Sequence, residues 1–253
     1  MKQGGASAVL GLDVGGSSVK AGLVDVLAGR LLQPPDSVPT PQPSAPQALM
    51  PVLRGLVERL APQQERIAVA FPSVVKGGRT LTAANIDRSW IGADAEGLAT
   101  AALGRAVRFL NDADAAGLAE MRWGAGKGLM GTVIMLTFGT GIGTALFTDG
   151  RLLPNSELGH LEVHGVDAET LASARARTRE KLDFPTWSKR VNDYLDAMFS
   201  LFWPDVFILG GAVSERFAEF APLLRSQAKL RPAHFVGHAG VIGAAWAAIG
   251  AEL

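Results

Sequence analysis

Short apolar runs alternate with amphipathic stretches along most of the chain. β-prone apolar runs predict strands over 9–14, 19–26, 67–71, 107–110, 132–138, 144–147 and 206–209. Apolar positions at helical spacing predict helices over 49–60, 92–104, 113–123, 188–203 and 241–249. The segment 33–51 is rich in Pro, Gln and Ser and is expected to be a loop. Strands that alternate with helices favour an α/β fold.

Two stretches, 9–26 and 132–147, share one pattern of an apolar strand, a glycine turn and a return strand. This repetition predicts two similar lobes. We expect an N-terminal α/β lobe over residues 1–111 and a C-terminal α/β lobe over residues 112–240. A C-terminal helix over 241–253 is expected to pack back on the first lobe.

Composition narrows the class of protein. The chain has 253 residues, of which 48% are hydrophobic and 19% charged, and 24 Lys and Arg balance 24 Asp and Glu. These values are typical of a folded globular protein, and zero net charge gives no general reason to expect a nucleic acid or an anionic membrane as partner. The absence of cysteine excludes disulfides, Cys-ligated zinc, iron–sulfur clusters and a Cys nucleophile.

The longest uncharged stretches, 128–148 and 232–251, approach the ~20 residues that span a bilayer. Glycines and threonines interrupt the first, and two histidines interrupt the second. Asp13 breaks the early apolar run and no small-residue cleavage site follows it, so no signal peptide is expected. The sequence therefore predicts buried elements of a cytoplasmic protein.

The two glycine turns are candidates for phosphate binding. They comprise 13–17 (Asp-Val-Gly-Gly-Ser) and 139–143 (Gly-Thr-Gly-Ile-Gly). Turns without side-chain bulk let backbone N–H groups approach phosphate oxygens. Each turn alone is compatible with an ordinary hairpin, but two turns at matching positions favour the phosphate interpretation.

The common nucleotide and hydrolase signatures are absent. The turn at 139–143 departs from G-x-G-x-x-G because Thr144 stands at the last position. The stretch 124–128 (Gly-Ala-Gly-Lys-Gly) lacks the first Gly and the Ser or Thr of a P-loop. No G-x-S-x-G elbow occurs either. A Rossmann dehydrogenase, a P-loop kinase and an α/β-hydrolase are therefore not supported.

Asn111 and Asp112 follow directly on a predicted strand and precede a predicted helix. Open α/β sheets bind ligands at the carboxyl ends of their strands. There a carboxylate could accept a proton from a substrate hydroxyl while the amide hydrogen-bonds the same substrate. The alternative is a pair that only caps the helix, and the pattern alone does not separate the two.

Polar and apolar residues alternate over 157–164, which begins at Glu157. If the segment is extended, His160, Glu162 and His164 share one face. Such a face is compatible with a metal site, a sugar site or the solvated side of a strand. No fourth metal ligand occurs nearby, so hydrogen bonding to adjacent sugar hydroxyls fits better.

A basic cluster follows, made of Arg175, Arg177, Arg179 and Lys181. A solvated helix surface is the more ordinary interpretation. The alternative is a track for an extended polyanion, along which point charges neutralise successive phosphates.

These motifs form a recognisable set. The chain resembles the ROK family of sugar kinases through 13–17, 111–117 (Asn-Asp-Ala-Asp-Ala-Ala-Gly), 139–143, 157–160 (Glu-Leu-Gly-His) and 209–211 (Leu-Gly-Gly). Within that family it is most similar to the polyphosphate-using branch, through 111–120, 153–160 (Leu-Pro-Asn-Ser-Glu-Leu-Gly-His) and the pair Thr40-Pro41. The resemblance covers nearly the whole chain.

The resemblance implies an actin-like (ribonuclease H-like) fold with two α/β lobes and the active site in the cleft between them. It implies an enzyme that phosphorylates the 6-hydroxyl of glucose with inorganic polyphosphate, with ATP as a further donor, and that uses Mg²⁺. A cytoplasmic homodimer is implied as well. The alternative activity is a strictly ATP-dependent glucokinase or glucomannokinase. A non-catalytic sugar sensor is disfavoured, because no helix-turn-helix precedes the first predicted strand.

The family's functional positions carry over one by one. Asp112 matches the catalytic base that deprotonates the sugar hydroxyl, and Asp13 is expected near the Mg²⁺-bound phosphate. The positions that match sugar-binding residues are Asn85, Asn111, Glu157, His160 and Glu169. The positions that match phosphate-binding segments are Gly15, Gly16, Ser17, Lys20, Thr140, Gly141, Gly210 and Gly211, of which the last two meet adenosine in relatives that use ATP.

The chain departs from the family pattern at three points. Many relatives carry a Cys-rich zinc motif after the Glu-x-Gly-His segment, whereas this chain has no cysteine, as in the polyphosphate-using branch. His238 stands where Asn is expected, and Ala212 replaces the third residue of a Gly-Gly-Gly run. Neither substitution touches Asp112, but both concern the side of the phosphoryl donor.

Overall fold

The computed structural model describes residues 8–250, and the chain divides into two compact units. The first comprises Met1–Ala119 and His238–Leu253, and the second Glu120–Gly237. This division differs from the boundary expected after residue 111, because one helix, α3 (Asp112–Trp123), contributes its first two turns to the first unit and its end to the second.

The first unit is built on a six-stranded sheet in the order β3-β2-β1-β5-β8, with β4 also paired to β2. Its strands are β1 (Ala8–Val14), β2 (Ser18–Asp25), β3 (Arg30–Leu31), β4 (Asp36–Pro39), β5 (Arg66–Phe71) and β8 (Ala106–Asn111). β1 and β2 form the expected antiparallel hairpin, whereas β1, β5 and β8 are parallel. The carboxyl ends of these three parallel strands therefore share one edge of the sheet.

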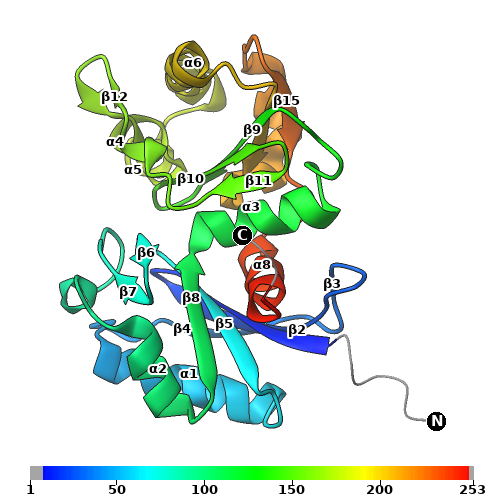
Figure 1. Cartoon of the computed structure of the whole chain (residues 1–253). Helices are drawn as coiled ribbons and strands as arrows, with labels where there is room; N and C mark the ends of the chain where they lie inside the picture. Colours follow the sequence, from blue (N-terminus) through cyan, green and yellow to red (C-terminus); the bar gives the residue numbers. More distant parts are fainter. Residues whose placement is uncertain (1–7, 251–253) are drawn as a thin grey trace. The chain divides into compact units, whose positions relative to one another are not determined.

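Helices cover both faces of the first sheet (Figure 1). α1 (Pro46–Leu60) and α2 (Ala95–Leu103) lie on one face, and α8 (Ala239–Ala248) lies on the other. Leu10 and Leu12 are fully buried in the core on the side of α1. Between them, Gly11 faces α8, and a Cβ there would overlap the carbonyl of Val241. The absence of a side chain thus lets α8 approach the strand backbone.

The segment 33–51 was expected to be a loop, and this expectation is wrong in part. It contains the edge strand β4 and the first residues of α1, which begins at Pro46. Proline is favoured in the first turn of a helix, where its missing N–H has no partner to lose. The rest of the unit contains a short ladder of β6 (Val75–Lys76) with β7 (Arg79–Thr80) and a 3₁₀ turn at Arg88–Trp90.

The second unit repeats the plan of the first. Its sheet has the order β11-β10-β9-β14-β15, with an antiparallel β9–β10 hairpin beside parallel β9, β14 and β15. These strands are β9 (Thr132–Phe138), β10 (Ile142–Thr148), β11 (Arg151–Leu153), β14 (Val206–Gly210) and β15 (Lys229–Pro232). The expectation of two similar α/β lobes is therefore confirmed.

The core of the second unit lies between its sheet and α6 (Phe184–Phe202). This helix begins four residues before the predicted start, because the Asp183 carboxylate accepts a hydrogen bond of 2.9 Å from the Thr186 N–H and caps the first turn. The smaller elements are β12 (Glu162–Val163), β13 (Val166–Asp167), α4 (Ala168–Ala172), α5 (Ala174–Arg179), α7 (Phe217–Phe220) and 3₁₀ turns at Leu158–His160, Ala212–Arg216 and Ala221–Leu223.

Glu120, near the end of α3, is fully buried in the second unit. Its Oε1 accepts hydrogen bonds from the backbone N–H groups of His234 (2.8 Å) and Phe235 (2.7 Å). Its Oε2 accepts one from the N–H of Ala125 at 2.8 Å. These bonds satisfy the buried carboxylate and tie the segment after β15 to the end of α3.

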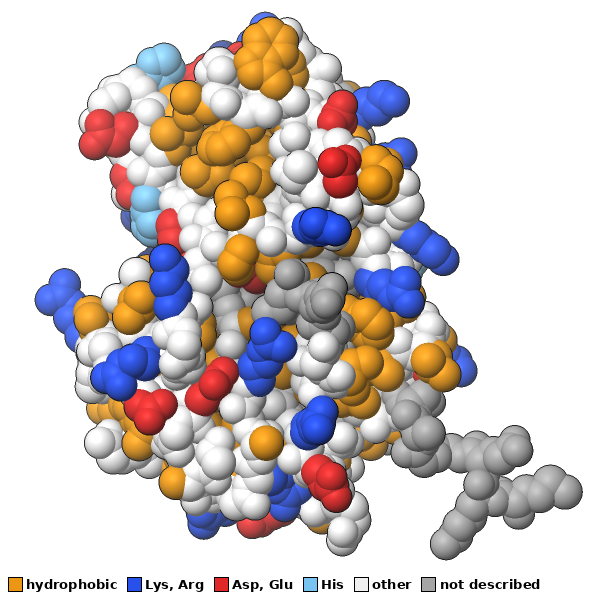
Figure 2. All heavy atoms as spheres, viewed as in Figure 1, with side chains coloured by type: hydrophobic (Ala, Val, Ile, Leu, Met, Phe, Trp, Pro, Cys, Tyr) orange, Lys and Arg blue, Asp and Glu red, His pale blue; other side chains and the backbone are white. Residues whose placement is uncertain are grey.

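The described surface carries charges of both signs. Figure 2 shows Lys and Arg interspersed with Asp and Glu on one face, and hydrophobic side chains gathered on the part that belongs to the second unit. The exposed large hydrophobic residues of that unit are Met130, Leu153, Val166, Leu201, Trp203 and Leu223. Within residues 8–250, no helix has the length and apolar character needed to cross a bilayer.

Candidate active site

In the first unit, the candidate residues gather at the carboxyl edge of the parallel strands. The strand register aligns Asp13 with Ala70, and Phe71 with Asn111. Because the parallel strands end at the same edge, Asp13 and the pair Asn111 and Asp112 lie along that edge. This is the place where open α/β sheets bind ligands.

The first glycine turn is fixed by Thr40, a buried residue of the segment after β4. The Thr40 hydroxyl donates to the carbonyl of Gly15 at 2.6 Å, and the Thr40 N–H donates to the carbonyl of Ser17 at 3.1 Å. A Cβ on Gly16 would lie 2.9 Å from the carbonyl oxygen of Asn85. The turn, Thr40 and Asn85 are therefore in contact, which brings a predicted phosphate segment next to a predicted sugar-binding residue.

Asp13 lies between β2 and the start of α8. It is paired with Lys20 across the β1–β2 hairpin, and a Cβ on Gly240 would come within 2.7 Å of its carboxyl carbon. Burial raises the pKa of Asp13 to about 6, and the positive charge of Lys20 partly opposes this shift. The first unit thus combines a buried carboxylate, a lysine and a glycine turn at one sheet edge.

The hydrogen bonds of Asn111 support the helix-capping interpretation of this pair, and the catalytic role of Asp112 stays a prediction. The Asn111 Oδ1 accepts from the N–H groups of Ala113 (2.9 Å) and Asp114 (3.1 Å), and its Nδ2 donates to the carbonyl of Ser73 at 3.2 Å. The buried amide therefore caps α3. Asp112 is half-buried in the first turn of α3, and its Oδ1 accepts a hydrogen bond of 2.8 Å from the N–H of Ala113.

In the second unit, the 157–164 segment is not the single extended strand that a shared face of His160, Glu162 and His164 would require. Leu158–His160 is a 3₁₀ turn, and the chain reverses between β12 and β13. His160 and His164 consequently have different partners, Asp167 at 2.8 Å and Asp193 at 3.4 Å. Among the described residues, no three His, Asp or Glu side chains form a group that could hold a metal ion. The shared-face metal interpretation is therefore wrong.

Glu157, His160 and Glu169 form an electrostatically coupled group. Burial raises the pKa of Glu157, with His160 opposing the shift and Glu169 adding to it. The hydrogen bond from His160 to Asp167 raises the pKa of His160, and both glutamates contribute to the same shift. Three of the predicted sugar-binding residues thus lie close together, and the pKa values of Glu157 and His160 respond to the charge of Glu169.

Asp167 belongs to the same group, although it was not among the predicted site residues. Its carboxylate binds the Nδ1 of His160 at 2.8 Å and also accepts a 2.8 Å hydrogen bond from the N–H of Glu169. It therefore orients the imidazole and caps α4 at once. No local sequence pattern indicates this role, because the pairing of Asp167 with His160 depends on the β12–β13 hairpin.

Glu169 also braces the second glycine turn. Its Oε2 accepts a hydrogen bond of 2.9 Å from the N–H of Ile142, and a Cβ on Gly141 would overlap the carboxylate. Within the turn, the N–H of Gly139 donates to the carbonyl of Gly141 at 2.9 Å. A predicted sugar-binding residue and a predicted phosphate turn are thus in direct contact.

Gly210 and Gly211 lie beside the same turn. Gly210 ends β14 next to Thr137 of β9. Gly211 has a φ of +85°, and a Cβ there would overlap the backbone of Phe138. Only glycine fits this left-handed, close-packed position. Thr140 is exposed within the turn. The four phosphate candidates of the second unit are therefore neighbours.

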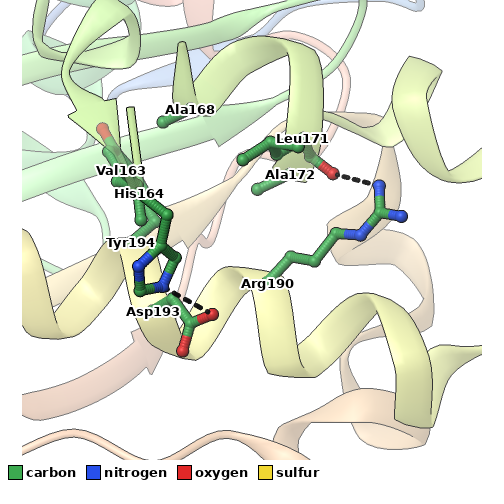
Figure 3. Close-up of a pocket in the computed structure, with 8 residues that line it drawn as sticks. All are labelled: Val163, His164, Ala168, Leu171, Ala172, Arg190, Asp193 and Tyr194. Atoms are coloured by element: carbon green, nitrogen blue, oxygen red, sulfur yellow. Dashed lines mark hydrogen bonds and ion pairs between the residues drawn. The ribbon is translucent and has the colours of Figure 1, made fainter. Parts of the chain in front are cut away.

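A small pocket lies between α4, α6 and the β12–β13 hairpin (Figure 3). His164 points toward Asp193 across it, and Arg190 donates a hydrogen bond of 3.1 Å to the carbonyl of Leu171. Its volume of about 20 Å³ holds about one water molecule. This pocket is too small for a hexose and is not the predicted sugar site.

Comparisons with known proteins agree with this arrangement. Residues 9–176 match the ROK family. The chain is 43% identical over 240 residues to the polyphosphate glucokinase of Mycobacterium tuberculosis, an alignment that covers 94% of this chain and 90% of the relative. It is also 43% identical to the polyphosphate glucokinase of Mycobacterium leprae, over 94% of this chain and 73% of the relative.

Solved structures show the same likeness. The inorganic polyphosphate/ATP-glucomannokinase from Arthrobacter sp. strain KM superposes with a TM-score of 0.92 at 43% identity, over 96% of this chain and 98% of that one. A ROK family glucokinase from Streptomyces griseus, solved with glucose and AMPPNP, has a TM-score of 0.82 at 24% identity, over 96% and 99% of the two chains, and shows the shared fold. By its sequence match and its fold, this chain belongs to the ROK family.

Proposed function

We propose that this chain phosphorylates glucose at its 6-hydroxyl, with inorganic polyphosphate as the phosphoryl donor and ATP as a second donor. The observation that carries the proposal is 43% identity, over 94% of the chain, to proteins named polyphosphate glucokinases. The glucomannokinase with a TM-score of 0.92 is named for both donors. The polar groups at the carboxyl edge of the first sheet and around the second glycine turn supply the chemistry that such a reaction needs.

In this proposal, Asp112 accepts the proton of the sugar 6-hydroxyl as that oxygen attacks the terminal phosphoryl group. A positioned general base contributes ~10²–10⁴-fold to a rate. The residues assigned to the sugar hydroxyls are Asn85, Asn111, Glu157, His160 and Glu169. Among these residues, the charge of Glu169 adds to the raised pKa values of both Glu157 and His160, which is consistent with a shared ligand.

The phosphate side of the proposal uses backbone amides and two charged residues. Gly15, Gly16 and Ser17 in one turn, and Thr140 and Gly141 in the other, offer N–H and hydroxyl donors without bulk, and Lys20 adds a cation. Gly210 and Gly211 are assigned to the part of the donor that lies beyond the transferred phosphoryl group. Asp13 fits Mg²⁺, because this metal is held in phosphoryl transferases by one or two carboxylates together with substrate phosphates. Bound Mg²⁺ would supply positive charge to the transferred group.

The test is a coupled assay for glucose 6-phosphate with polyphosphate or ATP as sole donor, in the presence of Mg²⁺. Turnover with polyphosphate supports the proposal. Turnover with ATP alone would establish the alternative, a strictly ATP-dependent glucokinase or glucomannokinase. Glucose binding without turnover with either donor would instead indicate a non-catalytic sugar sensor. Assays with mannose in place of glucose define the sugar selectivity.

We also propose a cytoplasmic homodimer. The exposed hydrophobic residues of the second unit support a self-association surface, and Leu201 and Trp203 at the end of α6 are 59% and 71% exposed. Light scattering on the purified protein should give twice the chain mass, and Trp203→Lys should shift it toward the monomer. A monomeric wild-type protein at micromolar concentration would refute the dimer.

A further inference from the structure

The segment 173–190 is strongly basic in a chain of zero net charge. It contains six Lys or Arg residues and two Asp or Glu residues. The segment forms α5 and the first turns of α6 in the second unit. The glucose and phosphate assignments above use none of these cations.

This basic segment is joined directly to the second glycine turn. The N–H of Arg175 donates a hydrogen bond of 3.0 Å to the carbonyl of Gly139. The Arg175 side chain is exposed, and it makes no hydrogen bond or ion pair with any other residue in 8–250. The backbone of Arg175 is thus hydrogen-bonded to the predicted phosphate turn, while its cationic side chain has no partner among the described residues.

Arg177, two residues after Arg175 in α5, is held in place by an aromatic ring. Its guanidinium lies over the Phe184 ring at 4.0 Å from the centroid, and Arg216 lies over the same ring at 4.6 Å. Stacking of this kind fixes the plane of an arginine while leaving N–H groups at its edge for an anion. Because Arg216 ends the 3₁₀ turn that follows Gly211, Phe184 links the surroundings of both glycine segments.

The acidic residues of this region neutralise other arginines. Glu180 binds Arg179 at 2.6 Å and Arg190 at 2.7 Å, and these bonds lower the pKa of Glu180. Glu219 binds Arg216 through two contacts of 2.6 Å. The pKa values of Glu219 and Asp183 are lowered mainly by the hydrogen bonds that these carboxylates accept from other residues. The positive charge of Arg177 lowers both values further. Of the arginines described in this region, Arg175 and Arg177 are thus the two that form no ion pair with a carboxylate of residues 8–250.

We propose that Arg175 and Arg177 bind the phosphates of an inorganic polyphosphate chain that follow its terminal phosphate, which the turn at 139–143 receives. The inference rests on the proposed function and adds the path that the donor takes over the second unit. A polyphosphate continues as an anion beyond its third phosphate, whereas ATP ends in a nucleoside. Arginines beyond the phosphate turn therefore favour the longer polyanion over ATP.

The decisive variant is Arg175→Gln, because the exposed side chain has no structural partner to lose. Its matched control is Arg151→Gln, which removes the same charge from β11 of the same unit. Arg151 pairs with Thr148, at the opposite end of β10 from the turn, roughly 20 Å away along the strand. Kinetics are measured for long-chain polyphosphate, tripolyphosphate and ATP, with melting temperatures recorded for each variant.

We expect Arg175→Gln to raise KM for long-chain polyphosphate about tenfold, the loss of about one charge-assisted hydrogen bond. The KM values for ATP and for glucose should stay within about twofold of the wild type. The melting temperature should stay within a few degrees of the wild type. Added salt should weaken polyphosphate binding less in the variant than in the wild type. Arg177→Lys, which keeps the charge but loses the stacking, should show a smaller rise in the same direction.

An unchanged polyphosphate KM in Arg175→Gln, or an equal rise in Arg151→Gln, would overturn this inference alone. An equal rise with ATP would also overturn it, because the contact would then serve any terminal phosphate. A wild-type protein that is inactive with polyphosphate would refute the proposed donor first and the inference with it. The wild-type assay thus separates the two failures.

Discussion

Glu169 Oε2 accepts a hydrogen bond of 2.9 Å from the N–H of Ile142, and its carboxylate occupies the space that a Cβ on Gly141 would need. One side chain thus contacts the second phosphate turn while its charge raises the pKa values of Glu157 and His160. The sugar and phosphate assignments of the second unit are coupled through this carboxylate. A change in the turn should therefore disturb sugar binding as well as phosphate binding.

We expect Gly141→Ala to lower kcat/KM for glucose at least tenfold, because the added methyl group displaces the Glu169 carboxylate. The matched control is Gly139→Ala, since a Cβ at Gly139 meets no atom within 4 Å. Steady-state kinetics with glucose as the varied substrate, together with the melting temperature, check the prediction. Equal kinetics in the two alanine variants would show that Glu169 does not transmit the change.

Asp112→Asn should bind glucose with near-normal affinity and lose about 10²–10⁴-fold in kcat. Asparagine can still accept the 2.8 Å hydrogen bond from the N–H of Ala113, so the first turn of α3 should remain intact. Calorimetric glucose binding and the coupled assay separate the two effects. Glu162→Gln, at an exposed position of β12, neutralises a carboxylate elsewhere and should keep full activity. Near-normal turnover in Asp112→Asn would exclude Asp112 as the base.

Asp13→Asn should stabilise the fold while abolishing activity. The folded pKa of Asp13 is about 6 and its ordinary value is 3.8, so the folded state binds the proton more tightly than the unfolded state. The ionised carboxylate therefore costs stability above pH 6, up to about 3 kcal/mol, and costs nothing below pH 3.8. Urea unfolding should show a gain for the variant at pH 7.5 that shrinks toward pH 4. A gain that is independent of pH would contradict this reasoning.

Asp167→Asn should lower the pKa of His160. The hydrogen bond to Asp167 raises that pKa, so it stabilises the fold fully below pH 6.5 and loses this effect as pH rises through the raised folded value. Asparagine can still accept from the N–H of Glu169 and keep α4 capped. The His160 ring protons, titrated by NMR, report the shift directly, and KM for glucose should rise.

The control for this experiment is Asp193→Asn. Asp193 pairs with His164 at 3.4 Å on the exposed side of the β12–β13 hairpin. This variant should leave the titration of His160 and KM for glucose unchanged. If Asp167→Asn leaves the titration of His160 unaltered, the pairing of these two side chains does not operate in solution.

Much of the fold follows from local patterns. The apolar runs around the two glycine turns predicted the hairpins β1–β2 and β9–β10, because each is formed by residues close in sequence. β4 was missed because its sequence, Asp-Ser-Val-Pro, lacks a strand pattern and is paired only through its long-range contact with β2. The alternation over 157–164 left a strand open, whereas a hydrogen bond from the N–H of Leu158 to the Thr144 hydroxyl helps to hold the start of the segment in a 3₁₀ turn.

The candidate site was predictable as residue types but not as contacts. Glycines at 15, 16, 139 and 141 follow from turn chemistry. The hydrogen bond from Thr40 to Gly15 spans 25 residues, and the bond from Ile142 to Glu169 spans 27. Nothing in the local pattern specifies either pairing. The same holds for Asp167, whose partner His160 is brought near by a reversal of the chain.

The stretch 111–120 ends at the buried Glu120, whose three backbone partners belong to the second unit. An inactive homologue with this fold would still need the glutamate, because the three backbone N–H groups would otherwise lose their acceptor. Retention of the stretch in a distant homologue consequently reports that the architecture is preserved, and says little about turnover. A homologue should therefore be judged active or inactive by the proposed functional positions 111 and 112, rather than by the whole ten-residue stretch.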